Sequence, residues 1–546
     1  MKKMTLKMRL MGGIVAFSML LGGCAQGFDS DERFTNGVSN TKLEAPVLTA
    51  ESFSLVLAAD GSEAIQVKWP VVMGAGGYRV SVDKVGVMEN GSLVDIDPIA
   101  VPLKGDQTTV EIDACSVTFP CEYGYQYAVT VQAMANKKLG NSESPLGEPA
   151  RYLYYTVPTP IPAGADLYEA IQFDPADPTS RAIYVLEPGA TYTMSKPIDF
   201  CQHNVQIYPA DYDAANNVYN MSTNRAIVQM KDIACFETAA GLQIKHVNFD
   251  CTELTLEKYS YGSDKASSKW HYALFAGSSG DSYPSLNCVN FGANPKDGAA
   301  KNFTYFLNDP IIIENCNFKN VPRAFLGGGY NAWIINDFRI NNCIIQVKTV
   351  DEDANNVNFI SWYKTCGAFE GGFGTNWLGG VRNLSITNST IYNLFNPNSK
   401  VRFMRWGNKN SLKDCFGSNE GSFTMTNCTL YKMYSQAEWG NNTPQDSKYI
   451  ITVTNNIFVD CARLNKLIGG GGVQKPMNNT GWVATPNGNE GNEMLSKSDV
   501  TNGIVVEEDP GFAEPTALDL NDNEFGGQNF KATGAISSTI GDPRWL

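Results

Sequence analysis

The sequence predicts an all-β protein in which an N-terminal β-sandwich precedes a long parallel β-helix, a solenoid of stacked coils. Short alternating runs separated by Gly and Asn turns predict the sandwich over residues 45–157. A ten-residue phrase that returns along residues 158–546 predicts the solenoid. The composition, 43% hydrophobic and 11% aromatic, is sufficient for a packed core in both parts.

Residues 1–23 form a targeting segment that takes no part in the fold. A basic stretch ending at Arg9 precedes an apolar run over 10–21, which is shorter than the roughly 20 residues of a membrane-spanning helix. The segment leads into "LLGGC", which resembles a bacterial lipobox. The resemblance implies a signal peptide over 1–23 and a lipid on Cys24. We therefore expect a lipoprotein anchored in the outer membrane.

An acidic linker over residues 24–44 follows the lipidated cysteine and carries Asp29, Asp31 and Glu32. It resembles the acidic export tag of Bacteroidota lipoproteins that are displayed on the cell surface, which implies surface exposure. A solvated linker with no export role explains the same residues. The sequence leaves surface and periplasmic orientations open.

The stretch 45–157 contains successive strand patterns, "AIQVKW", "GYRVSV" and "YQYAVTVQA", and Trp69 ends the first of them. This order resembles a fibronectin type III domain, and Trp69 matches the core tryptophan of that family. The resemblance implies a spacer module whose aromatic residues are core. "TVPTPIP" then predicts a stiff linker, and "ADLYEAIQ" a short helix after it.

The repeated phrase organises the rest of the chain. Its clearest copies are "IIIENCNFKN" from residue 311, "FRINNCIIQV" from 338, "LSITNSTIYN" from 384, "FTMTNCTLYK" from 423 and "ITVTNNIFVD" from 451. The shortest interval between copies is 27 residues, and longer intervals indicate loops inserted into a coil of that size. The fifth place holds, in order, His246, Cys288, Asn315, Asn342, Asn388, Asn427 and Asn455.

Each place in the phrase suits a parallel β-helix. Alternating apolar residues predict a strand with one buried face. The Asn stands where the chain must bend sharply, because Asn tolerates the left-handed backbone conformation. Amides stacked on adjacent coils can then hydrogen-bond to one another as a ladder. The cysteines at the sixth place, Cys316, Cys343 and Cys428, are expected to be small buried apolar residues. The eighth place is expected to point inward and to stack in a column of its own: Phe249, Phe291, Phe318, Ile345, Ile391, Leu430 and Phe458.

This pattern resembles the right-handed parallel β-helix of pectate lyases and related polysaccharide-active proteins, over residues 158–546. The C-terminal "DPGF" and "GDPRW" are similar to the ends of uncharacterised β-helix lipoproteins. Those lipoproteins are encoded beside glycan-uptake systems in Bacteroidota. The resemblance implies a polysaccharide as partner, with components of such an uptake system as further partners.

In that architecture the strand before each phrase lies in a sheet that often floors the substrate cleft. Here these strands are expected from "ALFAG", "TYFLN", "RAFLGG", "NFISWY" and "RFMRW". Arg323 and Arg402 hold similar places with Asn358 between them, which would suit the carboxylates of uronate sugars. Scattered solvated charge is the alternative interpretation.

Three aromatic residues at the ends of these strands, Trp362, Tyr363 and Trp406, are expected to stack on sugar rings. Packing within the core or the loops is the alternative. A lyase would also need a base beside a uronate, and the candidates are Arg402, Arg405 and Lys364. The motifs of polygalacturonase-like hydrolases, NTD, DD, GHG and RIK, are absent.

The net charge of −14 argues against nucleic acid as a partner. The sequence has no metal-ligand spacing, so we expect no metal and no cofactor, and "VDEDANN" does not support a Ca²⁺ site. We expect a surface lipoprotein that binds polysaccharide during glycan utilisation. The alternatives are a polysaccharide lyase acting by β-elimination, and a structural or adhesive surface protein.

Overall fold

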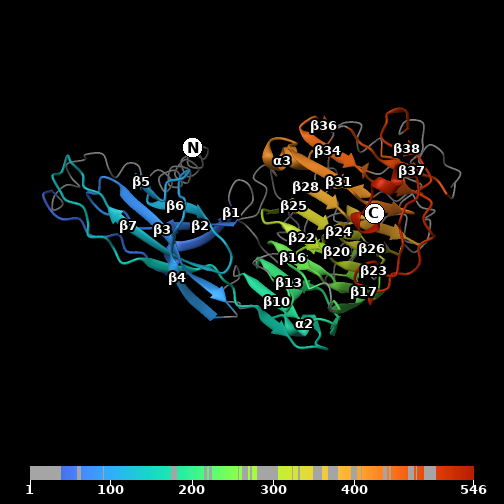
Figure 1. Cartoon of the computed structure of the whole chain (residues 1–546), viewed down its shortest axis with the longest axis horizontal. Coiled ribbons are helices and arrows are strands. Elements are labelled where there is room, and N and C mark those ends of the chain that lie inside the picture. The colour runs from blue at the N-terminus through green and yellow to red at the C-terminus, as the bar shows by residue number, and fades with distance from the viewer. Residues whose placement is uncertain are drawn as a thin grey trace, which may run out of the picture. The chain divides into compact units, whose positions relative to one another are not determined.

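The computed structural model describes residues 39–57, 63–89, 92–173, 181–213, 218–220, 224–255, 258–260, 268–270, 273–278, 305–322, 324–329, 333–348, 359–366, 379–394, 403–406, 409–433, 440–441, 444, 446–464, 472–474, 476–484 and 500–546. These residues form two compact units, which divide between Thr156 and Val157. Almost all regular structure is β, as predicted (Figure 1).

The described part of the N-terminal unit contains two antiparallel sheets. One has three strands: β1 (Phe53–Leu57), β2 (Glu63–Lys68) and β6 (Ser116–Pro120). The other has five strands: β3 (Tyr78–Glu89), β4 (Ser92–Ala100), β5 (Thr109–Ile112), β7 (Tyr125–Ala133) and β8 (Ala150–Leu153).

Side chains from both sheets meet in one apolar core, so the unit is a β-sandwich, the fold that the fibronectin type III resemblance implies. Ile65 of β2 and Val80 of β3 are both fully buried in it. Trp69 is buried too, and its ring lies edge-on to Tyr78 with 5.5 Å between centroids. The prediction that Trp69 is a core residue is confirmed.

The second unit contains three long parallel sheets, whose sizes are counted here over the described residues. The eleven-stranded sheet consists of β9 (Thr159–Ile161), β10 (Ala182–Leu186), β13 (Val205–Pro209), β16 (Leu242–Lys245), β22 (Ile311–Glu314), β25 (Trp333–Asn341), β28 (Gly380–Thr387), β31 (Gly421–Thr426), β34 (Tyr449–Thr454) and β36 (Gly472–Val473), with β21 (Tyr305–Leu307) beside β25.

The ten-stranded sheet consists of β11 (Thr191–Met194), β14 (Ile227–Asp232), β17 (Asn248–Leu254), β23 (Asn317–Val321), β26 (Ile344–Val347), β29 (Thr390–Asn393), β32 (Thr429–Tyr431), β35 (Ile457–Val459), β37 (Thr480–Trp482) and β38 (Val506–Glu507). The seven-stranded sheet consists of β12 (Ile198–Asp199), β15 (Phe236–Thr238), β20 (Ala273–Gly277), β24 (Ala324–Gly329), β27 (Ile360–Cys366), β30 (Met404–Arg405) and β33 (Gly440–Asn441).

Consecutive strands enter the three sheets in turn. One coil is β10, β11 and β12, and the next is β13, β14 and β15. Each strand pairs in parallel with its equivalent one coil away. The chain therefore winds as a parallel β-helix, whose stacked strands are visible from β10 to β36 in Figure 1.

The other described elements are short. They are the helices α2 (Leu167–Ala170) and α3 (Ser411–Phe416), the hairpin β18 (Lys258–Ser260) and β19 (Ser268–Trp270), and the 3-10 turns η3 (Ala50–Ser52), η8 (Ser537–Thr539) and η9 (Pro543–Trp545). Helix α2 lies within the predicted "ADLYEAIQ". It begins after Asp166, whose carboxylate accepts a hydrogen bond of 3.0 Å from the backbone N–H of Tyr168.

The interior of the solenoid follows the repeated phrase. Residues at the eighth place lie in register across the ten-stranded sheet and are almost completely buried: Phe249, Phe318, Ile345, Ile391, Leu430 and Phe458. The rings of Phe249 and Phe318 stack with 4.7 Å between centroids. The sixth-place cysteines are fully buried as well. Both predictions about the interior are confirmed.

The fifth place forms the corner between the eleven-stranded and ten-stranded sheets. Its residues all have positive φ, from 50° at Asn388 to 58° at Asn455. This is the left-handed region, which costs Asn less than other side-chain-bearing residues. The residues are His246, Asn315, Asn342, Asn388, Asn427 and Asn455, and Asn478 continues the series. The predicted bend at this place is confirmed.

The side chains of this corner form the expected ladder, with one interruption. Asn427 Nδ2 donates to Asn388 Oδ1 at 3.1 Å, and Asn455 Nδ2 donates to Asn427 Oδ1 at 3.3 Å. At the other end, Asn342 Nδ2 donates to Asn315 Oδ1 at 3.1 Å. Between these runs, Asn388 donates to Asn341 at 3.0 Å rather than to its neighbour in the column.

One member of the predicted column is wrong. The repeat predicts that Cys288 belongs to a coil of its own between the coils of His246 and Asn315. However, β16 pairs directly with β22, so these two strands belong to consecutive coils. The amide of Asn315 lies 2.7 Å from Nδ1 of His246, so these two side chains are neighbours in the stack. Cys288 itself lies outside the described residues. Phe291, the eighth-place residue of the same copy, lies outside them too. The long interval between His246 and Asn315 therefore belongs to one coil, which spacing alone did not distinguish from two coils.

The last part of the chain, residues 508–546, is called the C-terminal tail. It lies over the outer face of the ten-stranded sheet, where Leu518, Phe530 and Trp545 of the tail pack in one buried cluster with Tyr392 and Tyr431 of the sheet. The hydroxyl of Tyr392 donates to the backbone oxygen of Thr516 at 3.0 Å. The tail therefore covers an apolar strip that would otherwise face solvent.

Candidate functional site

The seven-stranded sheet was predicted to floor the cleft. Its strands β24, β27 and β30 are adjacent in the expected order. However, successive residues of β24 and β27 are buried, as at Ala324, Phe325 and Leu326 and again at Ile360, Ser361 and Trp362. Neighbouring residues of a strand point to opposite faces, so both faces are covered at these positions. The strand predicted from "TYFLN" is β21, and it belongs to the eleven-stranded sheet instead.

The prediction that Trp362 and Trp406 are exposed stacking faces is wrong. Trp362 is 0% exposed and Trp406 is 1% exposed, and both belong to the main core. A Cβ atom on Gly379 would lie 2.1 Å from the ring of Trp362, and one on Gly380 would lie 2.3 Å from the ring of Trp406. The two rings thus pack directly on glycine backbone, which leaves no room for a sugar between them.

Most of the charged and polar candidates are not placed by the structure. Arg323, Asn358 and Arg402 lie outside the described residues. Tyr363 and Lys364 are on β27, but their side chains also lie outside the described part. Arg405 is on β30 and is half-buried. Roles for these residues in binding or in β-elimination stay predictions.

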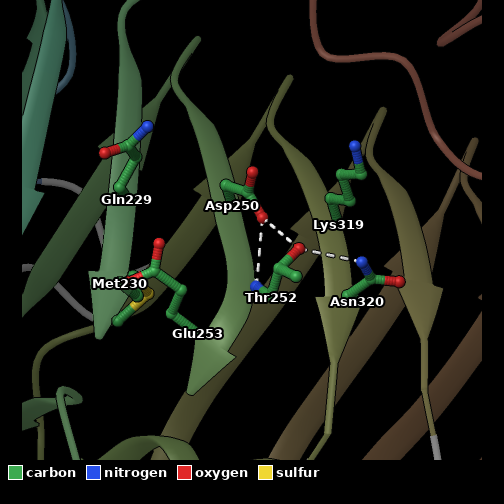
Figure 2. A pocket seen from close by; sticks show the side chains of 7 residues that line it. All are labelled: Gln229, Met230, Asp250, Thr252, Glu253, Lys319 and Asn320. Carbon is green, nitrogen blue, oxygen red and sulfur yellow. Dashed lines mark hydrogen bonds between the residues drawn. The ribbon is translucent and has the colours of Figure 1, made fainter. Parts of the chain in front are cut away.

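A different surface offers a hollow among the described residues. It lies on the outside of the ten-stranded sheet, has a volume of about 290 Å³, and is drawn in Figure 2. The lining side chains come from three adjacent strands: Gln229 and Met230 from β14, Asp250, Thr252 and Glu253 from β17, and Lys319 and Asn320 from β23. Gln229, Asp250 and Lys319 are level with one another in the sheet.

Irregular backbone occurs at this hollow. The register between β14 and β17 shifts after Gln229, and the register between β23 and β26 shifts after Phe318. Asn320 has a φ of 56°, in the left-handed region. Bulges of this kind bend a strand and redirect its side chains, and they recur next to functional sites. Here they occur in the strands that line the depression and at its neighbour β26.

Hydrogen bonds fix the polar groups of the hollow. Asp250 Oδ1 accepts from the backbone N–H of Thr252 at 3.0 Å and from its hydroxyl. The hydroxyl oxygen of Thr252 accepts from Asn320 Nδ2 at 2.8 Å, as the dashed lines in Figure 2 show. Asn320 Oδ1 in turn accepts from Gln346 Nε2 at 2.6 Å. The side chains are therefore held in place before any ligand arrives.

The hollow carries charges of both signs. Asp250 and Glu253 supply two carboxylates, and Lys319 supplies one ammonium group. Lys231 lies beside them, with its Nζ 3.5 Å from a carboxylate oxygen of Glu253, whose side chain is 65% exposed. Among the described residues, no group of three or more His, Cys, Asp or Glu side chains is placed to hold a metal ion.

The C-terminal tail lies near the hollow. Asn248 lies two residues before Asp250 on β17, so both point outward on the same face. Asn248 Nδ2 donates to the backbone oxygen of Leu520 in the tail at 2.7 Å. Gln346 also bonds the tail, since its Oε1 accepts from the N–H of Leu518 at 2.7 Å. The tail thus reaches β17 at Asn248, two residues or about 7 Å along the strand from Asp250, so it lies near the hollow without lining it.

The hollow was not predicted, although the residues that point outward from the ten-stranded sheet carry a signal for it. The residue after each buried eighth place points outward. That column changes along the solenoid, from Asp250, Lys319 and Gln346 at one end to Tyr392, Tyr431 and Val459 at the other. The polar end lines or supports the hollow, and the apolar end lies under the tail.

Comparison with known proteins adds little about function. A family model described as a domain of unknown function, DUF4992, matches residues 1–190. No curated protein matches the chain. No helix in the described part of the chain is long and apolar enough to cross a membrane.

Proposed function

We propose that the protein is a cell-surface lipoprotein that binds a polysaccharide in the hollow on the ten-stranded sheet. The observation that supports this proposal is the set of carboxylate, amide, hydroxyl and ammonium groups on three adjacent strands. Such groups donate and accept hydrogen bonds in the way that the many hydroxyl groups of a sugar require. A volume near 290 Å³ is close to the lower end of ligand sites, about 300–1,000 Å³.

The charges of the hollow favour a neutral sugar over a uronate. Asp250 and Glu253 would repel a sugar carboxylate, and Lys319 is the one cationic side chain that lines the hollow in the described part. The expectation of a uronate rested on Arg323 and Arg402, which lie outside the described residues. The hollow is a depression on the outside of a sheet, so a polymer can extend past it in both directions.

The predicted lipid anchor gives the location that we propose for the protein. A lipid on Cys24 would hold the chain in the outer membrane, and the acidic linker after it would favour display on the cell surface. The β-sandwich would then act as a spacer. Of the candidate bases, Lys364 and Arg402 have no described side chains and Arg405 is half-buried on β30, so a lyase stays the alternative.

A glycan-array screen of the mature protein, followed by calorimetric titration of the best ligand, tests the proposal. Glu253→Ala and Lys319→Met should each weaken binding about tenfold or more, which corresponds to about 1.4 kcal/mol. Thr424→Ala, on the outside of the eleven-stranded sheet, is the matched control and should bind as the wild type does.

Two outcomes would contradict the proposal. Binding that survives both substitutions in a folded protein would place the site elsewhere. Ultraviolet absorbance from unsaturated products, formed from a uronate polymer, would identify a lyase instead of a binding protein.

A further inference from the structure

The corner between the eleven-stranded and ten-stranded sheets holds buried hydrogen-bond donors that have no acceptor. Within the described residues they include Nε and Nη1 of Arg225, Nη1 of Arg544 and Nδ2 of Asn317. A buried polar atom without a partner costs about 1–3 kcal/mol. Native proteins contain few of them, so four donors at one corner require a physical explanation.

Two guanidinium groups meet at this corner on consecutive steps of the asparagine ladder. Arg225 Nη2 donates to Asn315 Oδ1 at 2.8 Å. Arg544 Nη2 donates to Asn342 Oδ1 at 2.6 Å and to the backbone oxygen of the same residue at 3.0 Å. Asn315 and Asn342 are themselves joined by a hydrogen bond, so the two guanidinium groups are held about one coil, or 4.8 Å, apart.

The charges at the corner do not balance. Arg225 is 3% exposed and forms no ion pair within the described part of the chain. Arg544 has one carboxylate nearby, since its Nε lies 3.7 Å from Asp542 Oδ1. The carboxylate of Glu314, the residue before Asn315, is already paired with another cation, since its Oε2 lies 3.5 Å from Lys245 Nζ. One positive charge is therefore left over in a buried position, which is costly.

Neighbouring groups do not supply the missing negative charge. Burial lowers the pKa of Arg225 to about 10, so its guanidinium keeps its proton at neutral pH. Burial and the charge of Arg225 lower the pKa of His246 to about 3, so that imidazole is neutral. Among the described residues, no group is left to balance the charge of Arg225.

We propose that this corner binds a small monovalent anion of halide size between Arg225 and Arg544. One such ion would accept from the donors without partners and would cancel the excess charge. Larger anions are excluded because the four donor atoms are all fully buried. The C-terminal tail also closes the corner, since Asn523 Oδ1 accepts from the backbone N–H of Arg225 at 3.3 Å.

The ion would couple the C-terminal tail to the coils beneath it. Arg544 belongs to the tail, whereas Arg225 and Asn317 belong to the solenoid, so the site is complete only when the tail is docked. A ligand that binds only the folded state stabilises it in proportion to ln(1 + [L]/Kd). Chloride should therefore stabilise the docked tail in a saturable way.

Thermal unfolding of the mature protein tests this inference independently of any glycan. The midpoint is measured in increasing sodium chloride, with sodium gluconate added to keep the ionic strength constant. We expect the wild-type midpoint to rise and saturate with chloride, and ³⁵Cl NMR lines to broaden. Arg225→Met removes the charge at similar side-chain volume and should abolish both effects. Lys531→Met removes an exposed charge from the same tail and should leave both unchanged.

The inference is overturned if the wild-type midpoint stays constant as chloride replaces gluconate. Water molecules would then satisfy the donors. The inference is also overturned if Arg225→Met folds and still responds to chloride. Should Arg225→Met not fold, wild-type crystals grown in bromide decide the question. An anomalous peak between the two guanidinium groups supports the site, and its absence refutes it.

Discussion

At the scale of single residues, burial decided the roles of the aromatic side chains. Trp362 lies within β27 and Trp406 directly follows β30, and both were expected to stack on sugar rings. Both nevertheless fill the core against Gly379 and Gly380. Trp406 also lies edge-on to Tyr449 with 5.9 Å between ring centroids. A ring in such a place stabilises the fold and cannot reach a ligand.

Trp406→Ala should therefore lower the free energy of unfolding by about 3–5 kcal/mol, the usual loss for a large buried aromatic ring. Chemical denaturation of the variant and the wild type measures the difference. Tyr168→Ala, at a residue that is 38% exposed, is the control and should change stability little. An unchanged denaturation midpoint for Trp406→Ala would show that the ring is not a core residue.

His246 is the one histidine in the ladder corner, and its environment keeps it neutral. It lies between the amide of Asn315 and the ring of Tyr219, with 5.0 Å between the ring centroids of Tyr219 and His246. Burial, and then the charge of Arg225, lower its pKa to about 3. The unfolded chain would protonate this histidine near its ordinary pKa of about 6.5.

Because the unfolded state takes up the proton and the folded state does not, stability should fall as the pH drops from about 6.5 toward 3. His246→Asn should remove this part of the pH dependence, since Asn suits the left-handed backbone at φ 55°. Thermal midpoints between pH 7 and pH 5 measure it, above the range in which most carboxylates titrate. Equal slopes for the variant and the wild type would contradict the shifted pKa.

At the scale of elements, the asparagine ladder joins neighbouring coils at their sharpest bend. Its members from Asn388 to Asn478 bond one another in an unbroken run. The run ends at Asn388, which bonds Asn341, while Asn342 accepts from Arg544 of the C-terminal tail. The ladder is thus a local feature of the repeat that the tail modifies at one point.

Asn427→Ala should cost about 1–3 kcal/mol of stability, because it leaves the amide groups of both neighbours without a partner. Asn478→Ala is the matched control, since Asn478 is exposed at the end of the run and has one ladder neighbour described. It should cost less. Denaturant titration of both variants checks the order, and equal losses would argue that the ladder bonds contribute nothing beyond the bend.

At the scale of the whole molecule, the ten-stranded sheet is divided between two uses. Near β14, β17 and β23 its outer face forms the polar hollow. Near β29 and β32 the same face lies under the C-terminal tail. The tail thus both covers the apolar part of the sheet and lies near the hollow, which confines the open polar surface to one end.

Anchoring is also a property of the whole chain. The lipobox predicts that Cys24→Ala abolishes acylation and releases the processed protein from membranes. Fractionation of cells that express each form, with metabolic labelling by a fatty acid, measures this. Membrane association of the Cys24→Ala protein after removal of its signal peptide would refute the anchor.

The sequence by itself determined the features that each coil specifies locally. The bend at Asn315 and Asn342, the buried column of Phe318 and Ile345, and the buried cysteines all follow from the short-range pattern of one phrase. Repetition strengthened the prediction, because the same pattern recurs in coil after coil. The core role of Trp69 was implied by the resemblance of the nearby strands to a fibronectin type III domain.

Only the tertiary structure decided which outward positions stay open. Tyr392 points out of its sheet but is buried by Phe530 of the tail, with 5.5 Å between ring centroids. Asp250 points out of the same sheet and stays in an open hollow. Strand periodicity gives the direction of a side chain, whereas its exposure depends on segments far along the chain. The tail reaches back 298 residues to bond Arg225, and no local pattern encodes such a contact.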